Sequence, residues 1–127
     1  MTGAPPNRWV TATVHREWGY VRITVLGEAD LANSDDLRML LAGIAAAYPG
    51  ATYIVDVRAA FLAVCALRVL VNWATAVATV DGFVAVAGAT STMRRAVRIV
   101  DGSGVLALVA APGDPPADRG LPSGQRS

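Results

Sequence analysis

The stretch from Tyr53 to Thr79 constrains the fold most, because a short apolar run is followed there by a long one. Residues 53–57 read Tyr-Ile-Val-Asp-Val, which is typical of a strand covered on both faces. From Val64 onward the polar residues recur at spacings of four, three and four, so they share one narrow stripe of a helix: Arg68, Asn72, Thr75 and Thr79. The stretch therefore predicts a core strand, a loop beginning at Arg58, and a helix that exposes only this stripe.

The loop between this strand and this helix lacks the groups that catalysis uses. In α/β proteins the functional residues commonly lie on such loops. Here residues 63–66 read Ala-Val-Cys-Ala, which offer no acid, base or hydroxyl. Cys65 is a soft nucleophile, but its neighbours are apolar and the single histidine, His15, is distant in the sequence. We interpret Cys65 as a small packing residue and predict that the protein is not an enzyme.

The remaining segments alternate between strand and helix patterns. Two alternating runs, over 10–15 and 20–25, flank Trp18-Gly19 and predict an antiparallel hairpin. A loop is expected over 27–32, then a helix capped by Asn33 or Ser34 that ends before Pro49-Gly50. The pattern is completed by a strand over 83–87, a helix capped by Thr90 or Ser91, and a strand over 105–110. We expect Arg94, Arg95 and Arg98 to lie on the outer face of this helix. The predicted fold class is α/β: a single domain with a mixed β-sheet, an antiparallel N-terminal hairpin and helices packed on the sheet.

Composition divides the 127 residues into one apolar body and two polar ends. Residues 1–8 are expected to form a flexible arm and residues 9–111 the folded domain. Residues 112–127 are rich in Pro, Gly, Ser, Asp and Arg, so we predict a disordered tail.

Charge and cysteine content exclude several classes of function. Eleven basic and ten acidic residues leave a net charge of +1, so the charge gives no reason to expect nucleic-acid binding. One cysteine allows no intrachain disulfide, and no apolar leader begins the chain, so a cytoplasmic location is expected. Residues 59–80 are long enough to span a membrane, but Arg68 would cost about 2.5–3.5 kcal/mol there, and we predict no membrane insertion. We also expect no cofactor and no metal site.

Short motifs resemble those of the STAS domain, the fold of bacterial anti-sigma factor antagonists. The segment Gly-Glu-Ala-Asp-Leu at 27–31 is similar to the family's Gly-Glu-Leu-Asp-Leu, and Val-Asp-Val at 55–57 is similar to its central strand. Phe61-Leu62 and Leu67 flank the position of the family's Asp-Ser-Ser-Gly, and Arg94-Arg95 and Gly102 match the end of the domain. The resemblance extends from about Val10 to Ala110.

The sequence departs from the family at its phosphorylation site. In the family, the first Ser of Asp-Ser-Ser-Gly is phosphorylated by an anti-sigma factor that is also a kinase. The four positions are here Ala63, Val64, Cys65 and Ala66, so the motif is degenerate and Val64 replaces the phosphorylated Ser. The resemblance therefore implies the fold and a protein-binding role in transcription regulation, without the phosphorylation switch.

We expect the partner, an anti-sigma factor or kinase-like regulatory protein, to bind at this loop. The predicted contact residues form an apolar patch rimmed by one acid and one base: Asp30, Leu62, Ala63, Val64, Cys65, Ala66 and Arg68. An equally favoured role for Asp30 is that of a turn acid before a helix. The three arginines 94, 95 and 98 are interpreted as a solvated face rather than an anion site, and the three tryptophans as core or edge packing.

Two functions are consistent with this pattern. The first is a regulatory binding module like an anti-sigma factor antagonist, not phosphorylated at the usual loop serine. The alternative is a STAS-type accessory subunit of a lipid-transport ATPase complex, which needs no phosphoserine. The sequence leaves open the identity of the partner and the oligomeric state, a homodimer included. Neighbouring genes that encode a kinase-like regulator, or a permease and ATPase, would distinguish the two.

Overall fold

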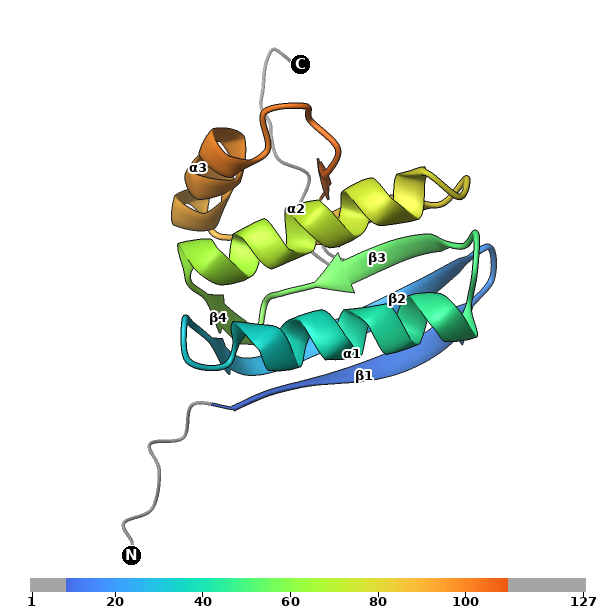
Figure 1. Ribbon diagram of the computed structural model, residues 1–127, viewed down its shortest axis with the longest axis horizontal. Coiled ribbons are helices and arrows are strands. Elements are labelled where there is room, and N and C mark those ends of the chain that lie inside the picture. The colour runs from blue at the N-terminus through green and yellow to red at the C-terminus, as the bar shows by residue number, and fades with distance from the viewer. Residues whose placement is uncertain (1–8, 110–127) are drawn as a thin grey trace, which may run out of the picture.

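The computed structural model describes residues 9–109, which form six strands and three helices in one α/β domain (Figure 1). The strands are β1 (Val10–Glu17), β2 (Tyr20–Ala29), β3 (Thr52–Asp56), β4 (Ala60–Leu62), β5 (Phe83–Ala87) and β6 (Ala107–Val109). The helices are α1 (Ser34–Ala47), α2 (Val64–Ala78) and α3 (Ser91–Val100). The predicted arm over 1–8 and the predicted tail over 112–127 lie outside the described residues.

The sheet is mixed, as the sequence predicts. Its strand order is β1-β2-β3-β5-β6, and β4 pairs with the end of β2 beside this path. β1 and β2 are antiparallel, whereas all other neighbouring strands are parallel. Gly19 makes the hairpin turn with a positive φ of 88°, a conformation that glycine adopts without strain.

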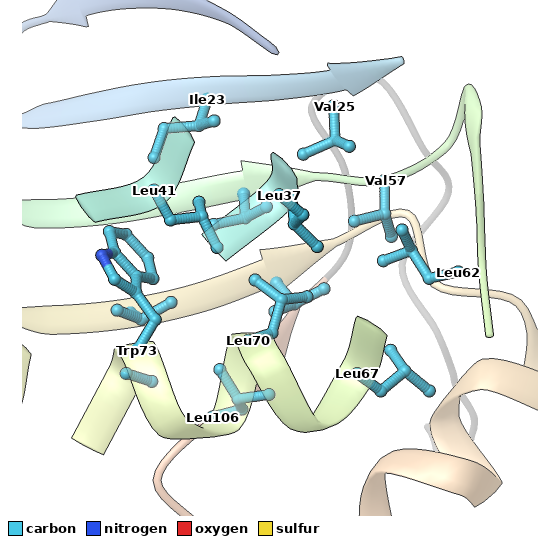
Figure 2. Packing of buried hydrophobic residues seen from close by; sticks show 14 of the residues in the cluster. Ile23, Val25, Leu37, Leu41, Val57, Leu62, Leu67, Leu70, Trp73 and Leu106 are labelled. Atoms are coloured by element: carbon cyan, nitrogen blue, oxygen red, sulfur yellow. The ribbon is translucent and has the colours of Figure 1, made fainter. Parts of the chain in front are cut away.

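The three helices lie on the same side of the sheet. In the order β2, β3, β5 and β6, each new strand is added on the same side of the strand before it. Because such connections are right-handed, every connecting helix then lies on the same face of the sheet. Figure 1 shows α1 and α2 side by side in front of the strands. In Figure 2, Leu37 and Leu41 of α1 lie next to Ile23 and Val25 of β2, and Leu70 and Trp73 of α2 point toward them from the other side of the core. This layer is the core of the domain, and all six of these side chains are buried.

Sequence periodicity agrees with the burial of the main elements. In β2, Val21, Ile23 and Val25 are buried while the residues between them are half-buried. The predicted stripe of α2 and its C-cap is exposed at all four positions, Arg68, Asn72, Thr75 and Thr79. The helix does not expose this stripe alone, however, because Val64, Ala76 and Ala78 are exposed as well. In the described part of the chain, no helix combines the length and the apolar character that crossing a membrane requires.

Two strand boundaries differ from the prediction at the same place. β2 does not end in a loop at Gly27 but continues to Ala29, and the expected loop after β3 contains the short strand β4. The two differences have one cause, because residues 27–29 of β2 pair with residues 60–62 of β4. Gly27 has a φ of +95°, and a Cβ there would lie 2.1 Å from the carbonyl oxygen of Trp9. The glycine that indicated a loop instead permits β2 to approach the backbone of Trp9, which directly precedes β1.

The last strand and the tryptophans also differ from the prediction. β6 begins at Ala107 rather than 105, because the carboxylate of buried Asp101 accepts hydrogen bonds from the backbone N–H groups of Val105 and Leu106. Of the three tryptophans, only Trp73 is buried; Trp9 is half-exposed and Trp18 is 98% exposed at the hairpin turn. The expectation of packing was wrong for Trp18.

Helix α3 agrees with its predicted start but not with its predicted outer face. The Thr90 side chain accepts a hydrogen bond from the Met93 backbone N–H, as an N-cap should. Arg95 and Arg98 are exposed. Arg94 is half-buried and its Nε donates to the Ala89 carbonyl oxygen, so it does not point freely outward.

Candidate partner-binding surface

The loop singled out by the sequence lies at the carboxyl-terminal edge of the parallel strands, beside the turn from β2 to α1. Ala29 of β2 is paired with Leu62 of β4. Just beyond this pair, the Ala63 backbone N–H donates to the Ala29 carbonyl oxygen at 2.9 Å. Two segments some thirty residues apart, 30–31 and 63–64, therefore meet at one edge of the sheet.

The turn from β2 to α1 is fixed by the side chain of Asn33. Its Oδ1 accepts from the Asp30 backbone N–H at 2.7 Å, and its Nδ2 donates to the Glu28 carbonyl oxygen at 2.7 Å. Asn33 stands at the predicted N-cap position of α1, but its side chain makes no capping bond to the helix. The Asp30 carboxylate accepts from the Ala32 N–H at 2.9 Å, which agrees with the turn-acid interpretation. Both side chains thus shape the turn that presents Leu31.

The segment from β3 to β4 is held by Asp56, which is buried at the end of its strand. Its Oδ1 accepts from the Arg58 backbone N–H at 3.0 Å, and its Oδ2 lies 3.1 Å from Arg58 Nη2 in an ion pair. The Arg58 side chain packs closely over Gly88, where a Cβ would lie 2.2 Å from Arg58 Cγ. A buried carboxylate is stable only with such partners. Asp56 is therefore a structural residue behind the loop.

Helix α2 begins directly after β4 without a side-chain cap. Ala63 is the N-cap, with an extended backbone, and its carbonyl oxygen accepts from the N–H groups of Ala66 and Leu67. The first turn of α2 contains no acidic residue, so its partial positive charge is not balanced by a side chain of that turn. Val64, the first residue of the helix, is 50% exposed.

The residues predicted to contact a partner separate into two groups. Val64 and Arg68 are exposed, and Asp30, Ala63 and Cys65 are half-buried, so all five reach the surface. Leu62 and Ala66 do not, because both are packed in the core. Leu62 pairs beside Ala29 and turns inward, and Ala66 lies on the inner face of α2. These two side chains support the surface from behind, which corrects the expectation that they form it.

Two exposed apolar residues at this edge were not among the predicted contacts. Leu31 is 83% exposed in the turn after β2, and Phe61 is 63% exposed on β4. Phe61 also lines an open groove of about 690 Å³ with Trp9, Glu28 and Arg58. The sequence contained a signal for both, since each is a large apolar residue beside the family-like motifs. We call Leu31, Phe61 and Val64, with Asp30 and Arg68 beside them, the loop-edge surface.

Comparisons with known proteins show the fold. No family model matches the chain, and no curated protein matches it. An anti-sigma factor antagonist from Mycobacterium paratuberculosis is similar in structure, with a TM-score of 0.67 and 20% identity over 83% of this chain and 89% of that one. The unphosphorylated form of the anti-sigma factor antagonist SpoIIAA gives a TM-score of 0.60 and 17% identity over 80% of this chain and 89% of that one.

A third similar structure belongs to a much longer protein. The murine anion transporter Slc26a9 gives a TM-score of 0.53 and 15% identity over 64% of this chain, which corresponds to 14% of the transporter. The helices, the mixed sheet and the opening hairpin described above agree with the two antagonist structures. The chain therefore has the fold of the anti-sigma factor antagonists.

Proposed function

We propose that this protein is a regulatory binding module that acts like an anti-sigma factor antagonist and is not phosphorylated at the usual loop position. Its partner would be an anti-sigma factor or a kinase-like regulatory protein, bound at the loop-edge surface. The fold supports the general kind of function, because two of the similar structures are anti-sigma factor antagonists.

The observation that carries the proposal is the exposure of large apolar side chains at the loop edge. Leu31, Phe61 and Val64 come from three different elements and are all at least half-exposed. Large apolar residues gathered at one edge of a small domain are typical of a protein-binding surface, especially with charged residues beside them. Here Asp30 and Arg68 supply those charges, which suits recognition of another protein.

The side chain at position 64 supports binding that phosphorylation at this position does not regulate. A phosphate on this loop would add about −1.5 to −2 charges and would oppose contact with an apolar partner surface. Val64 has no hydroxyl to receive it. Binding would then be constitutive and set by the abundance of the protein, or by a signal that acts on the partner.

A capture experiment from a lysate of the source organism tests the proposal. The full chain, Val64→Glu and Val80→Glu are used as baits in parallel. Val64 is the first residue of α2 and Val80 follows its last turn, and the two side chains are similarly exposed, at 50% and 58%. We expect a kinase-like regulator to be retained by the wild type and by Val80→Glu but lost by Val64→Glu. Retention of a permease or ATPase subunit would instead favour the accessory-subunit function.

The captured partner can also be used to test whether the protein lacks the phosphorylation switch. Incubated with ATP and the wild-type chain, it is expected to add no stoichiometric phosphate. Val64→Ser should restore phosphorylation only poorly, because Ala63 still lacks the family's acid and Ala66 its glycine. Stoichiometric phosphate on the wild type would contradict constitutive binding, and residues 90–92 would be the first positions to map by mass spectrometry.

A further inference from the structure

An acidic residue lies between two aromatic residues where β2 pairs with β4. In this parallel pair Glu28 is the direct register partner of Phe61. The next pair, Ala29 and Leu62, is buried in the core, so strand alternation turns Glu28 and Phe61 to the sheet face opposite the helices, where both are exposed. On the other side of β2, the Glu28 backbone N–H donates to the Trp9 carbonyl oxygen at 3.0 Å. The three residues are therefore neighbours across the sheet.

These three residues line the open groove of about 690 Å³ that adjoins the loop-edge surface. Both aromatic residues are accessible there, since Trp9 is 53% and Phe61 is 63% exposed. Apart from Arg58, the other residues that line the groove are small: Gly27, Ala59 and Ala60. The groove therefore presents aromatic surface and a carboxylate to a group that approaches from solvent.

Glu28 gives the groove its net charge. Within residues 9–109, its carboxylate forms no hydrogen bond and no ion pair. Arg58 also lines the groove, but its Nη2 lies 3.1 Å from Oδ2 of the buried Asp56, so its positive charge is balanced by that carboxylate. The groove is left with one negative charge beside aromatic side chains.

We propose that this groove receives an arginine side chain of the partner protein, next to that partner's apolar contact at Val64. A guanidinium group is planar, so it stacks on aromatic rings and pairs with a carboxylate at the same time. Glu28 attracts a cation and repels a carboxylate or a phosphate. The inference rests on the proposed function, because Phe61 belongs to both the groove and the loop-edge surface and one partner can cover both.

N-acetyl-argininamide and N-acetyl-citrullinamide form a matched pair of probes, since their shapes are nearly the same and only the first is charged. Each is titrated at constant ionic strength into the full chain labelled with ¹⁵N. The backbone amide signals of Glu28 and Phe61 and the indole N–H signal of Trp9 report binding. We expect the arginine probe to move these signals with saturation, and to bind about threefold to tenfold more tightly than the citrulline probe.

Two charge-neutralising substitutions locate the site. Glu28→Gln keeps the shape of the side chain and removes its charge, so we expect this variant to bind both probes alike. Asp36→Asn is the matched control, because Asp36 is an exposed acid near Trp9 that does not line the groove, and it should keep the preference for arginine. The inference is overturned if the wild type binds both probes alike, or if Glu28→Gln keeps the preference.

Calorimetry with the captured partner tests whether that protein supplies the arginine. We expect Glu28→Gln to weaken its binding about threefold to tenfold and Asp36→Asn to bind like the wild type. Equal affinities for the wild type and Glu28→Gln would overturn the assignment of the arginine to this partner. The probes require no partner, so their failure overturns this inference alone, whereas retention of the partner by Val64→Glu contradicts the proposed function.

Discussion

Buried polar side chains fix two of the turns in this domain, at Asn33 and at Asp101. The Asn33 side chain makes hydrogen bonds to the backbone of Asp30 and Glu28, and the Asp101 carboxylate accepts from the backbone N–H groups of Val105 and Leu106. Both side chains are nearly inaccessible to solvent, so if one of them is removed, water cannot easily replace its hydrogen bonds. These single residues therefore determine where α1 and β6 begin.

The carboxylate of Asp101 should contribute strongly to stability. Asp101→Ala leaves the N–H groups of Val105 and Leu106 without their acceptor, and we expect a loss of about 2 kcal/mol in the free energy of unfolding. The matched control is Asp35→Ala, which removes an exposed pair with Arg38 and should change the value by less than about 0.5 kcal/mol. Urea denaturation measures both, and equal midpoints for the two variants would contradict this role.

Tyr53 should make stability depend on alkaline pH. Burial raises the pKa of its phenol above the ordinary 10.0, because the charged form is poorly solvated there. The folded protein then holds the phenol proton more tightly than the unfolded chain does. The contribution of Tyr53 to the free energy of unfolding is therefore constant below pH 10 and falls as pH rises above it. Denaturation midpoints between pH 8 and 11 should decline less steeply for Tyr53→Phe, and parallel declines would exclude this residue as the cause.

At the scale of elements, the pairing of β2 with the start of β1 depends on a glycine. A Cβ at Gly27 would lie 2.1 Å from the Trp9 carbonyl oxygen, and its φ of +95° is unfavourable for other residues. We expect Gly27→Ala to destabilise the protein by at least about 2 kcal/mol. Gly43→Ala is the control, because Gly43 lies in α1 with open space around it and should gain about 0.5–1 kcal/mol. A neutral Gly27→Ala would show that the strands separate there without penalty.

The elements that could be predicted from the sequence are those with a repeating pattern. Alternation identifies the hairpin, and helical spacing identifies α1, α2 and α3. β4 has three residues, too few to show a period, and it exists because it pairs with β2. The extension of β2 through Gly27 follows from the same long-range pairing, so neither is visible locally.

The candidate site was predictable in position but not in its exact surface. The motif comparison places Val64 and Arg68 at the loop, and both are exposed. It cannot distinguish Leu62, which turns inward, from Phe61, which turns outward, since that depends on the register of β4. Leu31 is exposed because Asn33 and Asp30 shape its turn, and hydrogen bonds of this kind have no periodic signature.

At the scale of the whole molecule, α2 separates two surfaces. Its 15 residues span roughly 22 Å, with the loop-edge surface at its start and, near its end, an apolar groove that Trp73, Val77 and Val80 help to line. A substitution at one end should therefore leave the other unchanged. This separation makes Val80 a control position for substitutions at the loop edge.

Residues 112–127 are expected to contribute little to the folding of the domain. Leu121 is the only large aliphatic side chain among them, so little apolar area is available to bury. We predict that deleting them leaves the urea midpoint and its slope nearly unchanged. A markedly lower midpoint would instead show that the segment packs on the domain.

We propose that a partner binds the loop-edge surface through apolar contact at Val64. The most direct test is a calorimetric titration of the captured partner with the wild type, Val64→Glu and Val80→Glu. A carboxylate at the first residue of α2 suits the helix dipole, so Val64→Glu should fold as stably as the wild type. We predict that Val64→Glu weakens binding at least about tenfold, because an unpaired charge is costly to bury, while Val80→Glu binds like the wild type. Equal affinities for Val64→Glu and the wild type would show that the partner does not bind through Val64.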